Sequence, residues 1–172
     1  MVNITKPDLN ELLEPFARSI CAKAKALKRW ANDERFRPYR ARLRKAISDD
    51  INQCTNYLPP EVSEAALVKA KKLGRDLFTA NWHNQSSFDS KRKVFQWEHV
   101  VPVRSLVNLC LMNPTVPRIL DVLLSKAKMA WILKREDQEL TKRGYRSRRE
   151  DPVAAYRECG IVLVKQRNGI RE

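Results

Sequence analysis

The spacing of apolar residues changes its period near residue 83, and this change limits what the chain can fold into. Before that point, apolar side chains recur every three or four residues, which is the spacing of an amphipathic helix. Helices are therefore predicted over about 9–27, 38–54 and 61–81. Pro38 favours a first helical turn, and Pro59 and Pro60 separate the second helix from the third.

Beyond the polar segment 84–87, short runs rich in β-branched and aromatic residues predict strands over 93–101 and 128–133. Helical turns are expected over 104–112, with a further helix from Pro117, and a helix over 134–142 that Gly144 ends. A short helix and an apolar stretch follow near 151–157 and 161–164. The chain is thus predicted to be α+β and mostly helical. A basic helical portion, 1–82, and a second portion, 83–172, are expected to form one compact unit.

The net charge limits the choice of partner. Lys and Arg number 34 against 20 Asp and Glu, which gives +14 and a pI near 10.0. Such a surplus predicts a polyanionic partner, and double-stranded DNA is the first expectation, although a basic surface can also serve solubility alone. No apolar run is long enough for a bilayer, and the N-terminus lacks an apolar signal core, so an intracellular, DNA-associated protein with no membrane partner is expected.

The cysteines indicate a reduced protein without zinc. They lie 33, 56 and 49 residues apart, so the chain contains no CxxC pair of the kind that holds structural zinc. Reduced and mostly buried thiols are expected at all four positions: Cys21, Cys54, Cys110 and Cys159.

The chain contains only two histidines, and one of them follows a carboxylate in the segment Glu98-His99-Val100-Val101-Pro102. His83 follows Trp82 and is expected to be structural or to contact DNA. A histidine on a strand is often only a hydrogen-bonded structural residue. Here, however, the order is strand, His, Pro, second strand and then a helix that opens with acidic residues, which is the order of a ββα metal finger.

Residues 98–102 resemble the [DE]H[IV]xP signature of the HNH, or His-Me finger, nucleases. The resemblance covers residues 93–143 and implies a ββα-metal finger whose histidine ends the first strand and acts as general base. Many members carry CxxC pairs around the finger, and this chain has none; the central Asn of the family is not obvious either. Since 37 residues separate His99 from Glu136, an insertion is expected between the two strands.

The resemblance assigns roles to four residues. His99 is the expected base, Glu98 the first ligand of a single Mg²⁺ or Mn²⁺, and Asp137 or Glu136 the second ligand. Asp137 is favoured because a shorter carboxylate on a rigid helix is a more fixed ligand. Both acids could instead complement the helix dipole from its first turn. Regular pairing would point Glu98 and His99 to opposite faces, so a shared site requires an irregular strand end near Pro102.

These residues suit phosphodiester hydrolysis. A neutral imidazole can take a proton from water at cellular pH, and one hard cation held by carboxylates can neutralise charge on the phosphate. A metal-dependent DNA endonuclease is therefore the leading prediction, and paired cuts would favour a homodimer.

A basic segment after the finger, residues 142–149, carries five cations and no acid. A tyrosine among arginines can stack on a base or sugar while guanidinium groups hold phosphates, although the segment could also be a solvated loop. The expected nucleic-acid contacts are Arg104, Lys142, Arg143, Tyr145, Arg146, Arg148 and Arg149.

Two other functions stay open. In a non-catalytic nucleic-acid-binding protein, charge and helices would bind the partner and His99 would be structural. In a nuclease of the PD-(D/E)xK type, Asp89 and Glu98 would form the acidic pair. Position 100, two residues after Glu98, is Val where that type has Lys, which weakens this interpretation.

Overall fold

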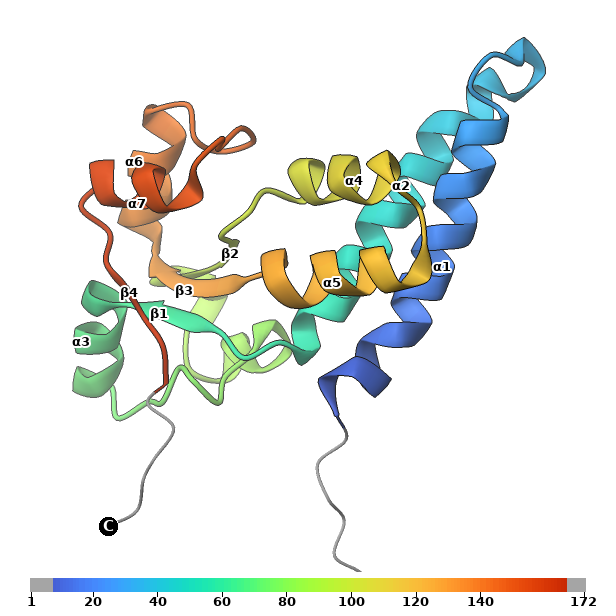
Figure 1. Ribbon diagram of the computed structural model, residues 1–172. Helices are drawn as coiled ribbons and strands as arrows, with labels where there is room; N and C mark the ends of the chain where they lie inside the picture. The colour runs from blue at the N-terminus through green and yellow to red at the C-terminus, as the bar shows by residue number, and fades with distance from the viewer. Residues whose placement is uncertain (1–7, 167–172) are drawn as a thin grey trace, which may run out of the picture. The chain divides into compact units, whose positions relative to one another are not determined.

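The computed structural model describes residues 8–166, and over these residues the chain is α+β and mostly helical, as predicted (Figure 1). Two compact units alternate along the chain. The helical unit comprises the described residues up to Leu58 together with Val103–Ala127, and the sheet unit comprises Pro59–Pro102 together with the residues from Lys128. This division differs from the expected boundary at residue 82, because residues 61–63 form a strand of the sheet.

The helical unit is built from helices whose apolar stripes face one another. Its helices are α1 (Leu9–Arg29), α2 (Arg37–Cys54), α4 (Val103–Met112) and α5 (Val116–Lys126). Leu13 and Ile20 of α1 and Ile47 and Ile51 of α2 are fully buried, as their helical spacing predicts. The helices expected in these four segments are confirmed. The cysteines are free thiols, and all except the partly buried Cys159 are buried, also as expected.

The sheet unit contains a mixed sheet, which has four strands within residues 8–166. The strands are β1 (Glu61–Ser63), β2 (Phe95–His99), β3 (Met129–Leu133) and β4 (Leu163–Val164), in the order β2-β3-β1-β4. β3 is antiparallel to β2 and parallel to β1, while β4 is antiparallel to β1.

The helix predicted over 61–81 is wrong at both ends. Residues 61–63 form β1, and α3 (Glu64–Lys72) begins only where the Ser63 hydroxyl accepts a hydrogen bond from the N–H of Ala66, 3.0 Å away. The helix ends before Gly74, whose φ of +63° lies in the left-handed region that favours glycine. Apolar spacing alone did not separate a three-residue strand from the helix that follows it.

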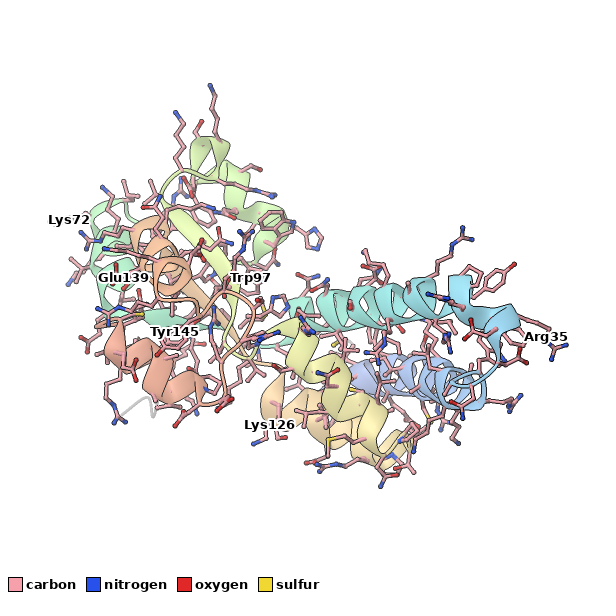
Figure 2. All side chains as sticks on the ribbon, turned by 90° about the horizontal axis from the view of Figure 1, so that it is seen from above. Arg35, Lys72, Trp97, Lys126, Glu139 and Tyr145 are labelled. Carbon is pink, nitrogen blue, oxygen red and sulfur yellow. The ribbon has the colours of Figure 1, made fainter. Side chains whose placement is uncertain are left out.

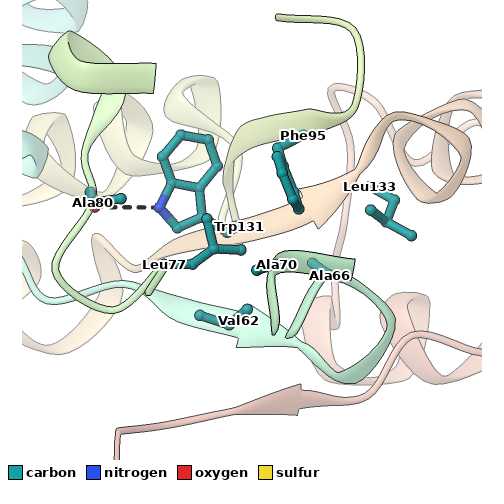
Figure 3. Packing of buried hydrophobic residues seen from close by; sticks show 8 residues of the cluster. All are labelled: Val62, Ala66, Ala70, Leu77, Ala80, Phe95, Trp131 and Leu133. Carbon is teal, nitrogen blue, oxygen red and sulfur yellow. Dashed lines mark hydrogen bonds between the residues drawn. The ribbon is translucent and has the colours of Figure 1, made fainter. Parts of the chain in front are cut away.

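Helices cover both faces of the sheet (Figure 1). On one face, Trp131 and Phe95 pack against Ala66 and Ala70 of α3, and the Trp131 indole donates to the carbonyl of Ala80 at 3.3 Å (Figure 3). On the other face, the strand residues Ala130 and Ile132 pack against α6 (Lys134–Lys142) and α7 (Pro152–Glu158). The alternation of side chains along β3 thus separates two apolar clusters.

The order of elements around β2 matches the prediction. β2 is followed by α4 and α5, then by its antiparallel partner β3, and α6 begins at the next residue. The segment 103–126 is therefore an insertion between two paired strands. None of the helices in the described part of the chain is long and apolar enough to cross a membrane.

The turn before β2 depends on the buried carboxylate of Asp89. It accepts hydrogen bonds from the backbone N–H groups of Lys93 and Phe95, each at 2.9 Å, and from that of Val94. The amide of Gln85 donates to it as well, at 3.0 Å. Burial pushes the pKa of Asp89 upward, but these hydrogen bonds outweigh burial and hold the pKa below its ordinary value.

This turn also contains two residues with unusual backbone angles. Lys91 and Arg92 have φ values of +56° and +51°, in the left-handed region that residues with side chains adopt at a cost. The Arg92 guanidinium lies over the Trp82 ring, 3.3 Å from its centre. Asp89 therefore stabilises a turn of unfavourable local conformation and fixes the residue at which β2 begins.

Replacing Asp89 with alanine should lower the free energy of unfolding by about 2–4 kcal/mol at pH 7, because several buried donors lose their acceptor. Urea denaturation measures the loss. Since the pKa of Asp89 is lowered in the folded state, its contribution is present above pH 3.8 and is lost as the pH falls below it. The advantage of wild type over Asp89→Asn should therefore shrink in acid. The control is Asp121→Ala, which removes an exposed ion pair with Arg118. Equally mild effects of the two alanine substitutions would show that Asp89 does not stabilise the turn.

Candidate functional site at the end of strand β2

The pairing of β2 with β3 determines where Glu98 and His99 point. Glu98 lies opposite Ala130 and His99 opposite Met129, and the N–H of Val100 continues the ladder to the carbonyl of Lys128 at 3.0 Å. Side chains alternate along such a strand, so Glu98 faces the side covered by α6 and α7 and His99 faces the other. The irregular strand end expected near Pro102 comes too late to bring both side chains to one face.

Glu98 forms a buried ion pair with Arg149. Nη2 of Arg149 lies 2.6 Å from Oε1 of Glu98, and the side chain of Arg149 is fully buried. Its Nη1 donates to the carbonyls of His99 and Val100 at 2.7 and 3.1 Å, and its Nε donates to the carbonyl of Tyr145 at 2.6 Å. Arg149 therefore holds the end of β2 from inside the protein, whereas it was expected to contact a phosphate of the DNA.

The charge of Asp137 acts on Glu98, and the charges of both carboxylates act on the hydroxyl of Tyr156. Burial raises the pKa of Glu98, the hydrogen bond and charge of Arg149 lower it, and the charge of Asp137 raises it again, so that the pKa lies above its ordinary value. Burial, with the nearby charge of Glu98, also raises the pKa of Tyr156. The Tyr156 hydroxyl is buried and has no hydrogen-bond partner among the described residues. A tyrosine and two carboxylates thus share this face with the arginine.

The two acidic residues at the start of α6 have different surroundings. Oε2 of Glu136 accepts hydrogen bonds from the backbone N–H of Leu133 and from the hydroxyl of Ser63, each at 2.7 Å. Glu136 therefore caps α6 and ties it to β1. A role at the start of the helix was the alternative to metal binding for both acids. Asp137 is half-buried and forms no ion pair or side-chain hydrogen bond within residues 8–166. Of the two, Asp137 is the carboxylate available to a ligand.

His99 lies in an environment that disfavours its charged form. Burial, with the nearby charge of Arg149, lowers the pKa of His99 from 6.5 to about 4. Its Nε2 is buried and has no partner in the part of the chain that the structure describes. The imidazole is therefore neutral near pH 7, and it is a weaker base than an ordinary histidine. His83, by contrast, is exposed on the turn Trp82–Ser87.

The basic segment 142–149 contributes to the surface only in part. Lys142, Arg146 and Arg148 are exposed, and Arg143 pairs with Glu139 at 2.7 Å. The Tyr145 hydroxyl donates to the carboxylate of Glu158. Arg104 is exposed on α4, which belongs to the helical unit.

The residues present suit a hard cation better than zinc. Within residues 8–166, no group of three or more His, Cys, Asp or Glu side chains could together hold a metal ion. Mg²⁺, however, is commonly held by one or two protein carboxylates together with waters and phosphate oxygens. Glu98 and Asp137 are the two carboxylates that would have to supply it, since α6 packs on the face toward which Glu98 points and the charge of Asp137 raises the pKa of Glu98. Asp89 is not a partner for Glu98 here, because both of its oxygens accept hydrogen bonds from its own turn.

Sequence reasoning missed Tyr156 and the internal role of Arg149. A signal for Arg149 is absent from its local sequence, where it is one of several arginines. Tyr156 lies in the short predicted helix at 151–157, and only the packing of that helix on the sheet brings it to Glu98. Comparisons with protein-family models, curated proteins and solved structures find no match to this chain.

Replacing Arg149 with alanine should lower the free energy of unfolding by about 3–5 kcal/mol, because Glu98 would remain buried without its partner. Urea denaturation of the two variants Arg149→Ala and Arg148→Ala tests this. Arg148 is an exposed neighbour, so its replacement should change stability by no more than about 0.5 kcal/mol. Adding Glu98→Gln to Arg149→Ala should recover part of the loss. Equal effects of the two single variants would show that Arg149 is not buried as described.

Proposed function

We propose that the protein is a metal-dependent DNA endonuclease of the HNH type, in which Glu98 and Asp137 hold one Mg²⁺ or Mn²⁺ and His99 is the general base. The observation that carries the proposal is the electrostatic interaction between Glu98 and Asp137. β2 pairs with β3, α6 follows at once, and the charge of Asp137 acts on Glu98 from the helix. This is the order of elements that the resemblance of residues 98–102 to HNH nucleases implies.

Each residue has a defined task in this proposal. Arg149 bonds Oε1 of Glu98 and leaves Oε2 for a cation, while Asp137 supplies the second carboxylate. When bound, the cation would polarise the scissile phosphate and stabilise the leaving oxygen. Arg149 also bonds the carbonyls of His99 and Val100, so that it positions the base and the first ligand together.

His99 would take the proton from the attacking water. Its lowered pKa keeps the imidazole neutral, and its unpartnered Nε2 is the atom that would accept. The side chain faces away from Glu98, but His99 is the last residue of β2. Because His99 pairs with Met129 and the N–H of Val100 bonds the carbonyl of Lys128, turning the imidazole toward a substrate on the Glu98 side requires the end of β2 to separate from β3.

DNA is the substrate that the surface charge favours. The net charge is +14. The exposed Lys142 ends α6, the helix that carries Asp137, and the exposed Arg146 and Arg148 follow it. Such side chains neutralise backbone phosphates without reading sequence. Double-stranded DNA is proposed as the substrate.

A second function is favoured by one observation. The Glu98–Arg149 pair is complete without a cation, and His99 lies on the opposite face of the strand. Both facts fit a nucleic-acid-binding protein in which these residues are structural. Cleavage of supercoiled plasmid in Mg²⁺, Mn²⁺ or EDTA separates the two functions, because only the nuclease nicks DNA and only in the presence of the cation.

Asp137→Ala should reduce metal-dependent nicking by orders of magnitude and change stability little, because Asp137 has no ion pair or side-chain hydrogen bond among the described residues. Glu136→Ala is the matched control on the same helical turn. It should lower stability, since Leu133 and Ser63 lose their acceptor, yet retain nicking at temperatures where the variant is folded. Plasmid nicking and urea denaturation are measured for both. Equal, mild effects on nicking would remove Asp137 from the metal site.

His99→Ala should lower the nicking rate by about 10²–10⁴-fold, the usual contribution of a general base, while DNA binding in EDTA persists. His83→Ala is the control, because His83 is the only other histidine and is exposed. A His99→Ala protein that is folded and nicks at the wild-type rate would overturn the catalytic assignment. A variant that nicks slowly only because it is unfolded is recognised by circular dichroism.

A further inference from the structure

A basic hollow of about 520 Å³ lies in the sheet unit, away from the segment 142–149. Its floor is apolar and includes Val94 and Leu133. Its cations come from α3, from the residue before Val94 and from the start of α6: Lys69, Lys72, Lys93, Lys134 and Arg135. Figure 2 labels Lys72 at the end of α3. The name basic hollow is kept below for the space that these five residues line.

The fold itself brings these cations together. The backbone N–H of Lys134 donates to the carbonyl of Val94 at 2.9 Å, which ties the first residue of α6 to the segment before β2. The Lys134 ammonium also bonds the side chain of Gln96. α3 packs on β3, the strand that leads into α6, so that Lys69 and Lys72 lie on the other wall.

The charge of the hollow is not compensated locally. None of its lining residues is acidic, and its five cations form no ion pair with any described carboxylate. Lys69, Lys72, Lys93 and Arg135 are exposed, so their charges act on the solvent and on any ligand. Like charges held this closely repel one another, and a bound polyanion relieves that repulsion.

We propose that the basic hollow binds phosphates of the DNA backbone, at a distance from the site where the DNA is cut. This inference rests on the proposed function, in which DNA is the partner. It adds a place on the sheet unit where the DNA backbone is bound. A free nucleotide fits less well, because the described lining contains no aromatic side chain on which a base could stack. An apolar floor with exposed cations around it suits a sugar-phosphate backbone.

The spacing along β2 relates the hollow to the candidate site. Val94 lines the hollow and His99 ends the strand, five residues further on. At about 3.3 Å per residue, these positions are roughly 16 Å apart, which corresponds to about five steps of about 3.4 Å along a DNA strand. The basic hollow and the end of β2 are therefore separated by no more than about half a helical turn of duplex.

The test compares two triple variants that remove the same charge. Lys69→Ala/Lys72→Ala/Lys93→Ala empties the hollow of three exposed cations. Lys71→Ala/Arg75→Ala/Arg157→Ala removes three exposed cations of the same unit that do not line it. Affinity for a fluorescent duplex is measured in EDTA between 50 and 200 mM salt, after circular dichroism has shown that both variants are folded.

The hollow variant should bind more weakly by about tenfold or more at 0.1 M salt, with a salt slope shallower by up to about 2.7, or roughly 0.9 per lost contact. The control should keep most of the wild-type slope. Equal slopes for the two variants would overturn the proposal. A second result would also overturn it. If wild type and the control bind inorganic tripolyphosphate tightly, and the hollow variant loses this binding but keeps the wild-type salt slope for DNA, the hollow is a site for small anions.

Nicking by the wild-type protein is measured separately with Mg²⁺. It distinguishes a failure of the nuclease proposal from a failure of the basic hollow. If wild type does not nick but the hollow variant loses DNA affinity, the nuclease proposal fails and the basic hollow stands. If wild type nicks and the hollow variant keeps its salt slope, the nuclease stands and the basic hollow fails.

Discussion

The buried ion pair between Arg149 and Glu98 is the interaction on which the end of β2 depends. Removing both charges from water is costly, and the cost is offset only when the remaining donors are also satisfied. Arg149 meets this condition through the carbonyls of Tyr145, His99 and Val100. One guanidinium thus joins the segment after α6 to the last residues of β2. The same contacts keep Glu98 on the side where Asp137 lies, so the geometry of the candidate site follows from this pair.

The elements of the fold could largely be predicted from the sequence, because long apolar stripes and Pro or Gly boundaries define them locally. Examples are the helix starting at Leu9 and the strand Phe95–His99, which lies within the predicted 93–101. β1 could not be predicted, since three residues carry no period and Val62 is a strand residue only through its pairing with Trp131. The two-unit organisation has the same origin: β1 and β3 are neighbours in the sheet but lie far apart in the sequence.

The candidate site could be predicted only for the residues that a local pattern marks. The segment 98–102 indicated Glu98 and His99, and the first turn of α6 indicated Asp137 and Glu136. Local sequence does not show that Glu136 caps α6 or that Arg149 is buried, because both facts depend on contacts with β1 and β2. An arginine in a basic segment is usually read as a surface residue. Here one of those arginines, Arg149, is buried because it pairs with the buried carboxylate of Glu98.

The central claim is that Glu98 and Asp137 together hold one divalent cation. A crystal structure of the protein soaked in Mn²⁺, with the ion located by its anomalous scattering, tests this claim most directly. We predict a single Mn²⁺ coordinated by Oε2 of Glu98 and by the carboxylate of Asp137, with Arg149 still bonded to Oε1. A fully soaked crystal in which no Mn²⁺ contacts either carboxylate, with the Glu98–Arg149 pair intact, would contradict it.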